Sequence, residues 1–223
     1  MANHKELLTA FQETGRVWLR GALSKRELQR LDELALQDGR PGKRIDPESS
    51  LFECLTNAQF NERIRAVWPG MRPVRLVSFE KAERSNWGVP WHQDRIIAVR
   101  GHANVRGFSN WSCKAGVWHC EPPLKVLEGM LFVRVHLDRN TAENGAMEIA
   151  LGSHCAGKLE TRHAQLAAEK YETETTVAEP GDVLILSMLT LHRSLPASTL
   201  EGRRAFRVDY ASQPLGRGLE WSI

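Results

Sequence analysis

The segment WGVPWHQD, residues 87–94, decides how the rest of the chain is interpreted. It begins with a tryptophan, passes through Pro90 and ends in His92-Gln93-Asp94. An imidazole and a carboxylate two residues apart can reach one cation where the strand that carries them ends and turns. His92 and Asp94 are therefore predicted to be the first two ligands of a mononuclear iron site.

A later histidine must complete such a site, and His192 is the candidate. It follows an apolar run, residues 183–189, that has the composition of a buried strand. In a jelly roll, a partner strand of this kind comes back beside the strand end that carries the first two ligands. Two histidines and one carboxylate hold iron on one face and leave about three coordination positions open. Taken alone, His192 could equally be a buried structural histidine.

Arg203 lies eleven residues beyond His192, after a stretch that contains Pro196 and Gly202. A turn there would return the chain as the adjacent antiparallel strand. An arginine in that place can hold the far carboxylate of a dicarboxylic acid through two parallel hydrogen bonds, a geometry that lysine cannot reproduce. The combination of His192 and Arg203 predicts a carboxylate site next to the metal.

A second His-x-Asp pattern, at His136 and Asp138, competes with the first. It ends a strand predicted over residues 130–137, which carries apolar side chains on one face and Arg134, His136 and Asp138 on the other. That polar face cannot lie unpaired in an apolar core. It either lines a substrate cavity or is paired or exposed in the ordinary way.

The predicted elements are helical first and rich in strands afterwards. Helices are predicted over residues 4–13, 24–36 and 57–67, with a short strand at 17–19 and a surface loop at 38–50. Strands are then predicted over residues 74–81, 130–137, 146–151, 173–177, 183–191 and 205–210, with a helical region near 159–170. This order indicates an α+β protein, mainly β, with a β-sandwich or jelly roll as its core. We expect one domain over residues 1–223, with helical support in 1–70 and the core in 71–210.

Composition limits the classes of function. The chain has 223 residues, 42% of them hydrophobic, which is enough for one domain with its own core. Its 30 basic residues are scattered among 27 acidic ones, so neither a nucleic acid nor a membrane is indicated as a partner. A small-molecule substrate is expected, for a monomer or a homodimer.

The expected compartment follows from what the sequence lacks. The N-terminus does not have the pattern of a signal peptide, and no stretch approaches the ~18 apolar residues of a membrane span. The four cysteines show no Cys-x-x-Cys spacing, which argues against a zinc ribbon and for reduced thiols. The protein is therefore expected to be cytoplasmic.

Six segments spread over most of the chain form a specific combination: Thr14-Gly15-Arg16-Val17-Trp18-Leu19, Trp91-His92-Gln93-Asp94, Asn144-Gly145-Ala146-Met147, Gly152-Ser153-His154, Pro180-Gly181-Asp182, and His192 through Arg203. Together they resemble the phytanoyl-CoA dioxygenase family of iron(II)/2-oxoglutarate oxygenases. The chain is similar in particular to a bacterial branch with Pro-Trp-His-Gln-Asp, Trp-Ser-x-Lys-x-Gly at 111–116 and His-x-x-Pro-Pro at 119–123. It departs from the family's usual Pro-Gly-Ser-His by placing Leu151 before Gly152. The resemblance implies a double-stranded β-helix, a cupin-like jelly roll, with the N-terminal helices packed on its major sheet.

The resemblance also implies roles for particular residues. His92, Asp94 and His192 would bind iron(II), Arg203 would bind the 5-carboxylate of 2-oxoglutarate, and Ser194 would assist that carboxylate. The implied reaction consumes 2-oxoglutarate and O2, releases succinate and CO2, and hydroxylates a substrate C–H bond, although related enzymes also desaturate, epoxidise or close rings. Because Asp94 keeps the carboxylate that related halogenases lack, halogenation is disfavoured.

Further side chains are candidates for the walls of the pocket. Trp87, Trp91, Trp111 and Trp118 crowd the region around the metal motif, either as a hydrophobic wall or as ordinary core. Trp111 also matches an aromatic near the cosubstrate in the family. The candidates for substrate contact are Lys81, Trp91, Lys114, Arg134 and His136, each with a solvated or structural role as the alternative. A loop over residues 95–128 and the segment 211–223 are expected to shape the pocket.

Two other classes of function stay open on the residues alone. One is a non-catalytic cupin-like protein that binds a metal or a ligand, and the other is a metallohydrolase with zinc on the same three ligands. The intact set of His92, Asp94, His192 and Arg203 favours the oxygenase, because a binder needs neither an open metal face nor a carboxylate clamp. Dependence on the cosubstrate separates the three classes.

Overall fold

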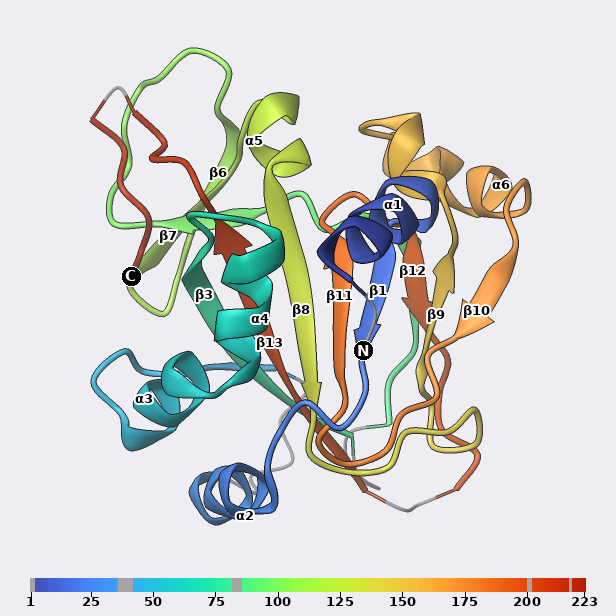
Figure 1. Cartoon of the computed structure of the whole chain (residues 1–223). Coiled ribbons are helices and arrows are strands. Elements are labelled where there is room, and N and C mark those ends of the chain that lie inside the picture. Colours follow the sequence, from blue (N-terminus) through green and yellow to red (C-terminus); the bar gives the residue numbers. More distant parts are fainter. Residues whose placement is uncertain (1–2, 36–41, 82–85, 200–201, 217) are drawn as a thin grey trace.

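The computed structural model describes residues 3–35, 42–81, 86–199, 202–216 and 218–223 (Figure 1). Its helices are α1 (His4–Thr14), α2 (Lys25–Leu34), α3 (Ser50–Asn57), α4 (Phe60–Val67), α5 (Leu124–Glu128) and α6 (Ala164–Ala168), with 3-10 helices η2 (Ser153–Ala156) and η3 (Thr161–His163). Its strands are β1 (Arg16–Leu19), β2 (Lys43–Arg44), β3 (Arg72–Lys81), β4 (Val89–His92), β5 (Ile97–Val99), β6 (Ser109–Lys114), β7 (Val117–Glu121), β8 (Met130–His136), β9 (Met147–Ala150), β10 (Thr173–Thr175), β11 (Val183–Ser187), β12 (His192–Ser194) and β13 (Arg203–Ala211).

The strands form three antiparallel sheets. The major sheet has the order β1-β11-β8-β13-β3-β2, the minor sheet has the order β10-β9-β12-β4, and β5-β7-β6 form a third sheet. Helices α1 and α4 lie on one side of the major sheet, and the minor sheet lies on the other (Figure 1). This arrangement confirms the mainly β, jelly-roll fold with helices packed on the major sheet.

Alternation along the major strands gives this sheet two different faces. On β13, Phe206, Val208 and Tyr210 belong to the core that the helices cover. The intervening residues of β13 point the other way, and two of them, Arg203 and Arg207, line a pocket between the sheets. The pocket therefore lies on the inner face of the strands whose outer face holds the helices.

The helical region begins as the sequence predicts and then differs. Asn3 and Ser24 form capping boxes at the starts of α1 and α2, which satisfy backbone N–H groups that a helix start leaves unpaired. The end predicted for the second helix, and the first residues of the predicted loop at 38–50, fall in 36–41, outside the described residues. The helix predicted over 57–67 is present as α4, which begins at Phe60, whereas α3, capped by Ser49, is a further helix that was not predicted.

The junction between α3 and α4 is tied to the major sheet through Asn61. Its buried amide donates to the carbonyls of Leu55 (2.9 Å) and Ala58 (2.8 Å), and its Oδ1 accepts from the Tyr210 hydroxyl (2.5 Å). We expect Asn61→Ala to lower the free energy of unfolding by about 2–4 kcal/mol, because it leaves several buried polar groups without partners. Tyr210→Phe, which removes one bond and keeps the ring, should cost about 1 kcal/mol. Urea unfolding measures both, and equal losses would contradict this account.

The region after the metal motif is more structured than predicted. Residues 95–128, interpreted from sequence as a loop, contain β5, β6, β7 and α5. The strand predicted over 183–191 stops at Ser187, since the next residues turn before β12 begins. The helical region near 159–170 is reduced to the short η3 and α6.

Candidate metal centre

Strands β4 and β12 bring the predicted ligands together. The two strands pair antiparallel with His92 directly opposite His192, and their imidazole rings lie 4.2 Å apart between centroids. Asp94 follows His92 by two residues, just past the end of β4, so its carboxylate turns back toward both rings. The Nε2 atom of His192 lies 3.2 Å from Oδ2 of Asp94. One ligand atom from each of the three residues lies within 4.8 Å of the other two.

Backbone carbonyls orient both imidazoles for a metal. Nδ1 of His92 lies 2.8 Å from the Pro90 carbonyl, and Nδ1 of His192 lies 2.9 Å from the Thr190 carbonyl. A carbonyl can only accept, so Nδ1 carries the proton in both rings and Nε2 offers its lone pair. Burial and the neighbouring His192 also lower the pKa of His92, which keeps that ring neutral. Two imidazoles and one carboxylate are the donor set that suits iron(II) with open positions.

Asp94 is kept ionised by a buried arginine. Burial alone would raise the pKa of Asp94, but Arg207 and His192 outweigh it and hold that pKa well below the ordinary value. Nη1 of Arg207 donates to Oδ2 of Asp94 at 2.5 Å, and the rest of its guanidinium bonds Asp209. Arg75 lies 3.7 Å from Asp209 as well. A ligand carboxylate held this way is charged and oriented before a metal arrives.

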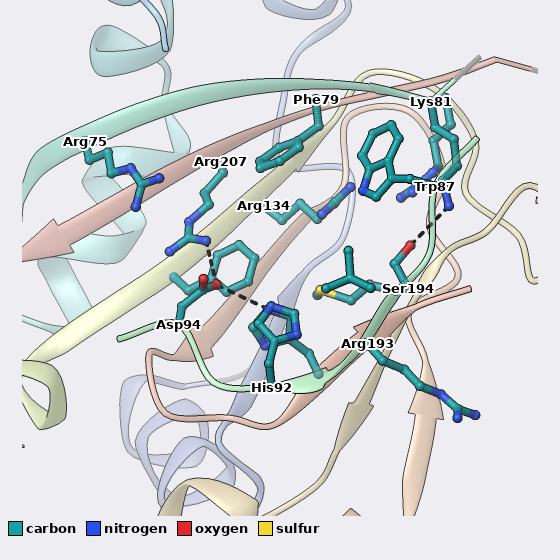
Figure 2. Close-up of a pocket in the computed structure, with 15 residues that line it drawn as sticks. Arg75, Phe79, Lys81, Trp87, His92, Asp94, Arg134, Arg193, Ser194 and Arg207 are labelled. Atoms are coloured by element: carbon teal, nitrogen blue, oxygen red, sulfur yellow. Dashed lines mark hydrogen bonds and ion pairs between the residues drawn. The ribbon is translucent and has the colours of Figure 1, made fainter. Parts of the chain in front are cut away.

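The three ligands open onto a pocket of about 240 Å³. Figure 2 shows Asp94 and Arg207 toward one end of it, with Lys81, Trp87 and Ser194 toward the other. Apolar side chains supply part of the wall, and these are Phe79, Trp87, Val89, Phe132 and Met147.

The end of the pocket away from Arg207 suits a carboxylate. Arg203 is only 4% exposed, and its Nε and Nη1 have no hydrogen-bond partner in the part of the chain that is described. Lys81 lies opposite Arg203 on β3, and its Nζ donates to the Leu195 carbonyl (2.6 Å) and lies 3.3 Å from Ser194 Oγ. A buried guanidinium without a counter-ion is costly unless an anion pairs with it. These residues therefore fit the distal carboxylate of a dicarboxylic acid.

The structure brings some predicted site residues into this pocket and leaves others outside it. Lys81, Arg134, Ser194 and Arg203 line the pocket together with the three predicted metal ligands. Trp111 lies on β6 against His102, with ring centroids 4.6 Å apart, and is not among the lining residues. Lys114, at the end of β6, is exposed.

Two further candidates are buried beside the pocket without lining it. Trp91 packs with Ala150 and Leu191 in a separate cluster, and only Trp87 of the four tryptophans lines the pocket. His136 is fully buried, with Nδ1 near the Asp182 carbonyl and its ring 5.7 Å from that of Trp18. Its burial, together with Arg134, lowers its pKa to about 3 and keeps it neutral.

Arg75 and Arg207 line the pocket but were not predicted as site residues from the sequence. Arg207 is on the same face of β13 as Arg203, four residues later, so the period-two alternation of that strand held the signal. Arg75 is on the same face of β3 as Lys81 for the same reason.

Comparisons with solved structures agree on the fold. The epimerase SnoN in complex with Fe3+, alpha ketoglutarate and nogalamycin RO is 16% identical, with a TM-score of 0.69, over 96% of this chain and 87% of that one. EctD from S. alaskensis with 2-oxoglutarate and 5-hydroxyectoine is 15% identical, with a TM-score of 0.69, over 95% and 76%. EvdMO1 is 17% identical, with a TM-score of 0.68, over 94% of this chain, which spans half the length of the EvdMO1 chain.

Comparison by sequence gives the family. No curated protein matches the chain by sequence. The model of the family described as Phytanoyl-CoA dioxygenase (PhyH) matches residues 46–205, well over half of the chain, and the match includes His92, Asp94, His192 and Arg203. The chain therefore belongs to the phytanoyl-CoA dioxygenase family, and it is a non-haem iron(II)/2-oxoglutarate-dependent dioxygenase.

Proposed function

We propose that this dioxygenase hydroxylates a C–H bond of a small molecule, with His92, Asp94 and His192 as the iron ligands. Arg203, with Lys81 and Ser194, is proposed to bind the 5-carboxylate of 2-oxoglutarate. The observation that carries the proposal is the joint placement in one pocket of the triad and a buried Arg203 whose Nε and Nη1 have no partner among the described residues. A zinc hydrolase or a simple binder has no use for that arginine, whereas a dicarboxylate cosubstrate needs it.

The residues of the chain supply binding, orientation and shielding for this reaction. When bound, iron(II) and 2-oxoglutarate supply the oxidising power that couples release of succinate and CO2 to insertion of one oxygen atom of O2 into the substrate. Arg207 keeps the Asp94 carboxylate charged and fixed. Phe132, packed 5.4 Å from the His192 ring, and Trp87 limit the access of water to the metal face.

Hydroxylation is favoured over halogenation because Asp94 occupies the position that a halide would need. The conversion to be tested is oxidative decarboxylation coupled to oxygen transfer. Purified protein with iron(II), 2-oxoglutarate and 18O2 should convert a substrate from a metabolite extract into a product that carries one 18O atom, with one succinate formed for each product. Succinate formation with a product that lost two hydrogens and gained no 18O would replace the hydroxylase assignment with a desaturase or cyclase.

The cosubstrate's affinity should fall as the pH rises through about 8. Burial, followed by the charges of Arg203 and Arg134, lowers the pKa of Lys81 to about 8. Below that pH the ammonium is charged and attracts the carboxylate; above it, binding must take up a proton, so affinity declines. Titration of 2-oxoglutarate into the Mn(II)-loaded protein from pH 6.5 to 9 measures the decline. The Lys81→Met variant should bind 2-oxoglutarate more weakly at low pH, and its affinity should no longer decline through pH 8. An unchanged decline in this variant would contradict the assignment to Lys81.

Partners and compartment are proposed on the same basis. We infer a small-molecule substrate, acted on by a monomer or homodimer. Among the described residues, no helix is long and apolar enough to cross a bilayer. All four cysteines, Cys54, Cys113, Cys120 and Cys155, are unpaired thiols, which supports the reducing environment of the cytoplasm.

A further inference from the structure

The pocket holds more positive charge than the cosubstrate accounts for. Of its lining cations, Arg207 is paired with Asp94 and Asp209, and Arg193 is paired with Glu148. Figure 2 shows Arg193 pointing away from the pocket and Arg134 pointing into its middle. Arg134, Arg203 and Lys81 have no carboxylate partner within the described ranges.

Arg134 is the cation of this group that lies nearest the centre. It is on the inner face of β8, directly opposite Arg207 on β13 and 8% exposed. Its Nε has no hydrogen-bond partner in the described structure, and its guanidinium carbon lies 5.7 Å from the centre of the Phe79 ring. Burial, followed by the charges of Arg203 and Arg207, lowers its pKa well below the ordinary value. The fold thus places a guanidinium where no carboxylate of the described residues neutralises it.

One cosubstrate molecule does not balance these charges. The 1-carboxylate of 2-oxoglutarate is taken by the metal, and the single negative charge of its 5-carboxylate faces Arg203 and Lys81. Arg134, only 8% exposed, then has no carboxylate partner among the described residues, which is costly for a guanidinium. The neighbouring Arg207 and Arg75 each lie against carboxylates of the chain, and Arg203 faces the cosubstrate, so the missing counter-ion at Arg134 points to a further ligand.

We propose that the primary substrate is a small organic acid whose anionic group, a carboxylate or a phosphate or sulfate ester, pairs with Arg134. The inference rests on the proposed function, because it assigns the 5-carboxylate of the cosubstrate to Arg203 and Lys81. The anion at Arg134 fixes one end of the substrate between the 5-carboxylate of the cosubstrate and the metal. The apolar residues Phe79, Phe132 and Met147 then contact its hydrocarbon part and present one C–H bond to the metal face.

The test uses a matched pair of probes on the protein loaded with Mn(II) and saturating 2-oxoglutarate. Butyrate and its neutral analogue butyramide have similar shapes and differ in charge. Calorimetry should show butyrate binding at least about tenfold more tightly than butyramide, as a charge-assisted pair in a buried site requires. Arg134→Met should remove that preference and leave the affinity for 2-oxoglutarate within about threefold, and Arg134→Lys should restore part of the preference.

Controls separate this role from the alternatives. Arg193→Met, at an arginine already paired with Glu148, should leave the preference unchanged. Because Arg134 has no ion-pair partner among the described residues, Arg134→Met should also raise the urea midpoint of the metal-free protein. That result would show that the variant folds and would exclude a structural ion pair. Equal binding of the two probes would overturn the proposal. So would an Arg134→Met variant that binds 2-oxoglutarate as weakly as Arg203→Met, because Arg134 would then belong to the cosubstrate clamp. Failure of the wild-type protein to bind 2-oxoglutarate at all would refute the proposed function itself.

Discussion

His192→Ala should abolish oxygen-dependent conversion of 2-oxoglutarate to succinate. The imidazole is one of the three proposed metal ligands, and its loss leaves one nitrogen and one carboxylate, too few to hold iron on one face. The metal affinity should fall by more than the roughly 10–100-fold that loss of an outer-shell partner causes. Iron content after dialysis and succinate release from the anaerobically loaded protein, on addition of O2, measure the two effects.

The matched control is His163→Ala, at an exposed histidine of η3. This variant should keep the wild-type iron stoichiometry and succinate rate. His192→Ala also removes a buried ring that packs on Phe132, so its fold must be checked by circular dichroism and urea unfolding. A folded His192→Ala protein that still binds one iron and forms succinate at the wild-type rate would show that the metal lies elsewhere.

Arg203→Met should weaken the binding of 2-oxoglutarate by about 30- to 100-fold. Loss of one partner from a buried charge pair costs about 2–5 kcal/mol, and the lower end applies because Lys81 stays in place to face the carboxylate. This loss of affinity should come only from the contact between Arg203 and the distal carboxylate. With 2-oxobutyrate, which chelates in the same way and lacks that carboxylate, wild type and Arg203→Met should therefore bind with similar affinity. Anaerobic titrations of both acids measure the difference.

Arg204→Met is the matched control for this variant. Arg204 is the next residue of β13, but it points away from the pocket and pairs with Asp138 and Asp32. Its replacement should leave the affinity for 2-oxoglutarate unchanged. If Arg203→Met weakened the binding of 2-oxobutyrate as much as that of 2-oxoglutarate, the effect would come from disturbance of the pocket. The assignment of Arg203 to the distal carboxylate would then be wrong.

The metal motif was predictable because its geometry is local. His92 and Asp94 are two residues apart at a strand end, and an apolar strand pattern precedes His192. Local sequence patterns therefore indicate both segments that carry the predicted ligands. Arg203 was predictable from its spacing after His192, but the expected adjacent strand is wrong, because the chain crosses from β12 in the minor sheet to β13 in the major sheet. None of these steps requires knowledge of which distant residues touch.

The rest of the site depends on register between strands far apart in sequence. Alternation alone puts Arg134 and His136 on one face of β8, but the structure separates them: Arg134 enters the pocket and His136 is covered by Trp18. The pairing of Arg207 with Asp94 joins strand β13 to the end of β4, and no local pattern marks it.

The third sheet was missed for a different reason. Its strands are short, and the sharp turn between β6 and β7 places Ala115 at φ +48° and Gly116 at φ +78°, without the usual Asn-Gly or Asp-Gly signal of a hairpin. The predicted substrate contact at Lys114 and the cosubstrate contact at Trp111 both depended on where this hairpin would lie. Their assigned roles stay predictions, and the structure places both side chains away from the pocket lining.

The most direct test of an iron(II)/2-oxoglutarate site on His92, Asp94 and His192 is optical. Iron(II) is added anaerobically to the metal-free protein, followed by 2-oxoglutarate, and the visible spectrum is recorded. Bidentate chelation of the cosubstrate should produce a weak metal-to-ligand charge-transfer band, absent in His192→Ala and reached only at higher 2-oxoglutarate concentration in Arg203→Met. A well-folded, iron-loaded wild-type protein that shows no band would contradict the account.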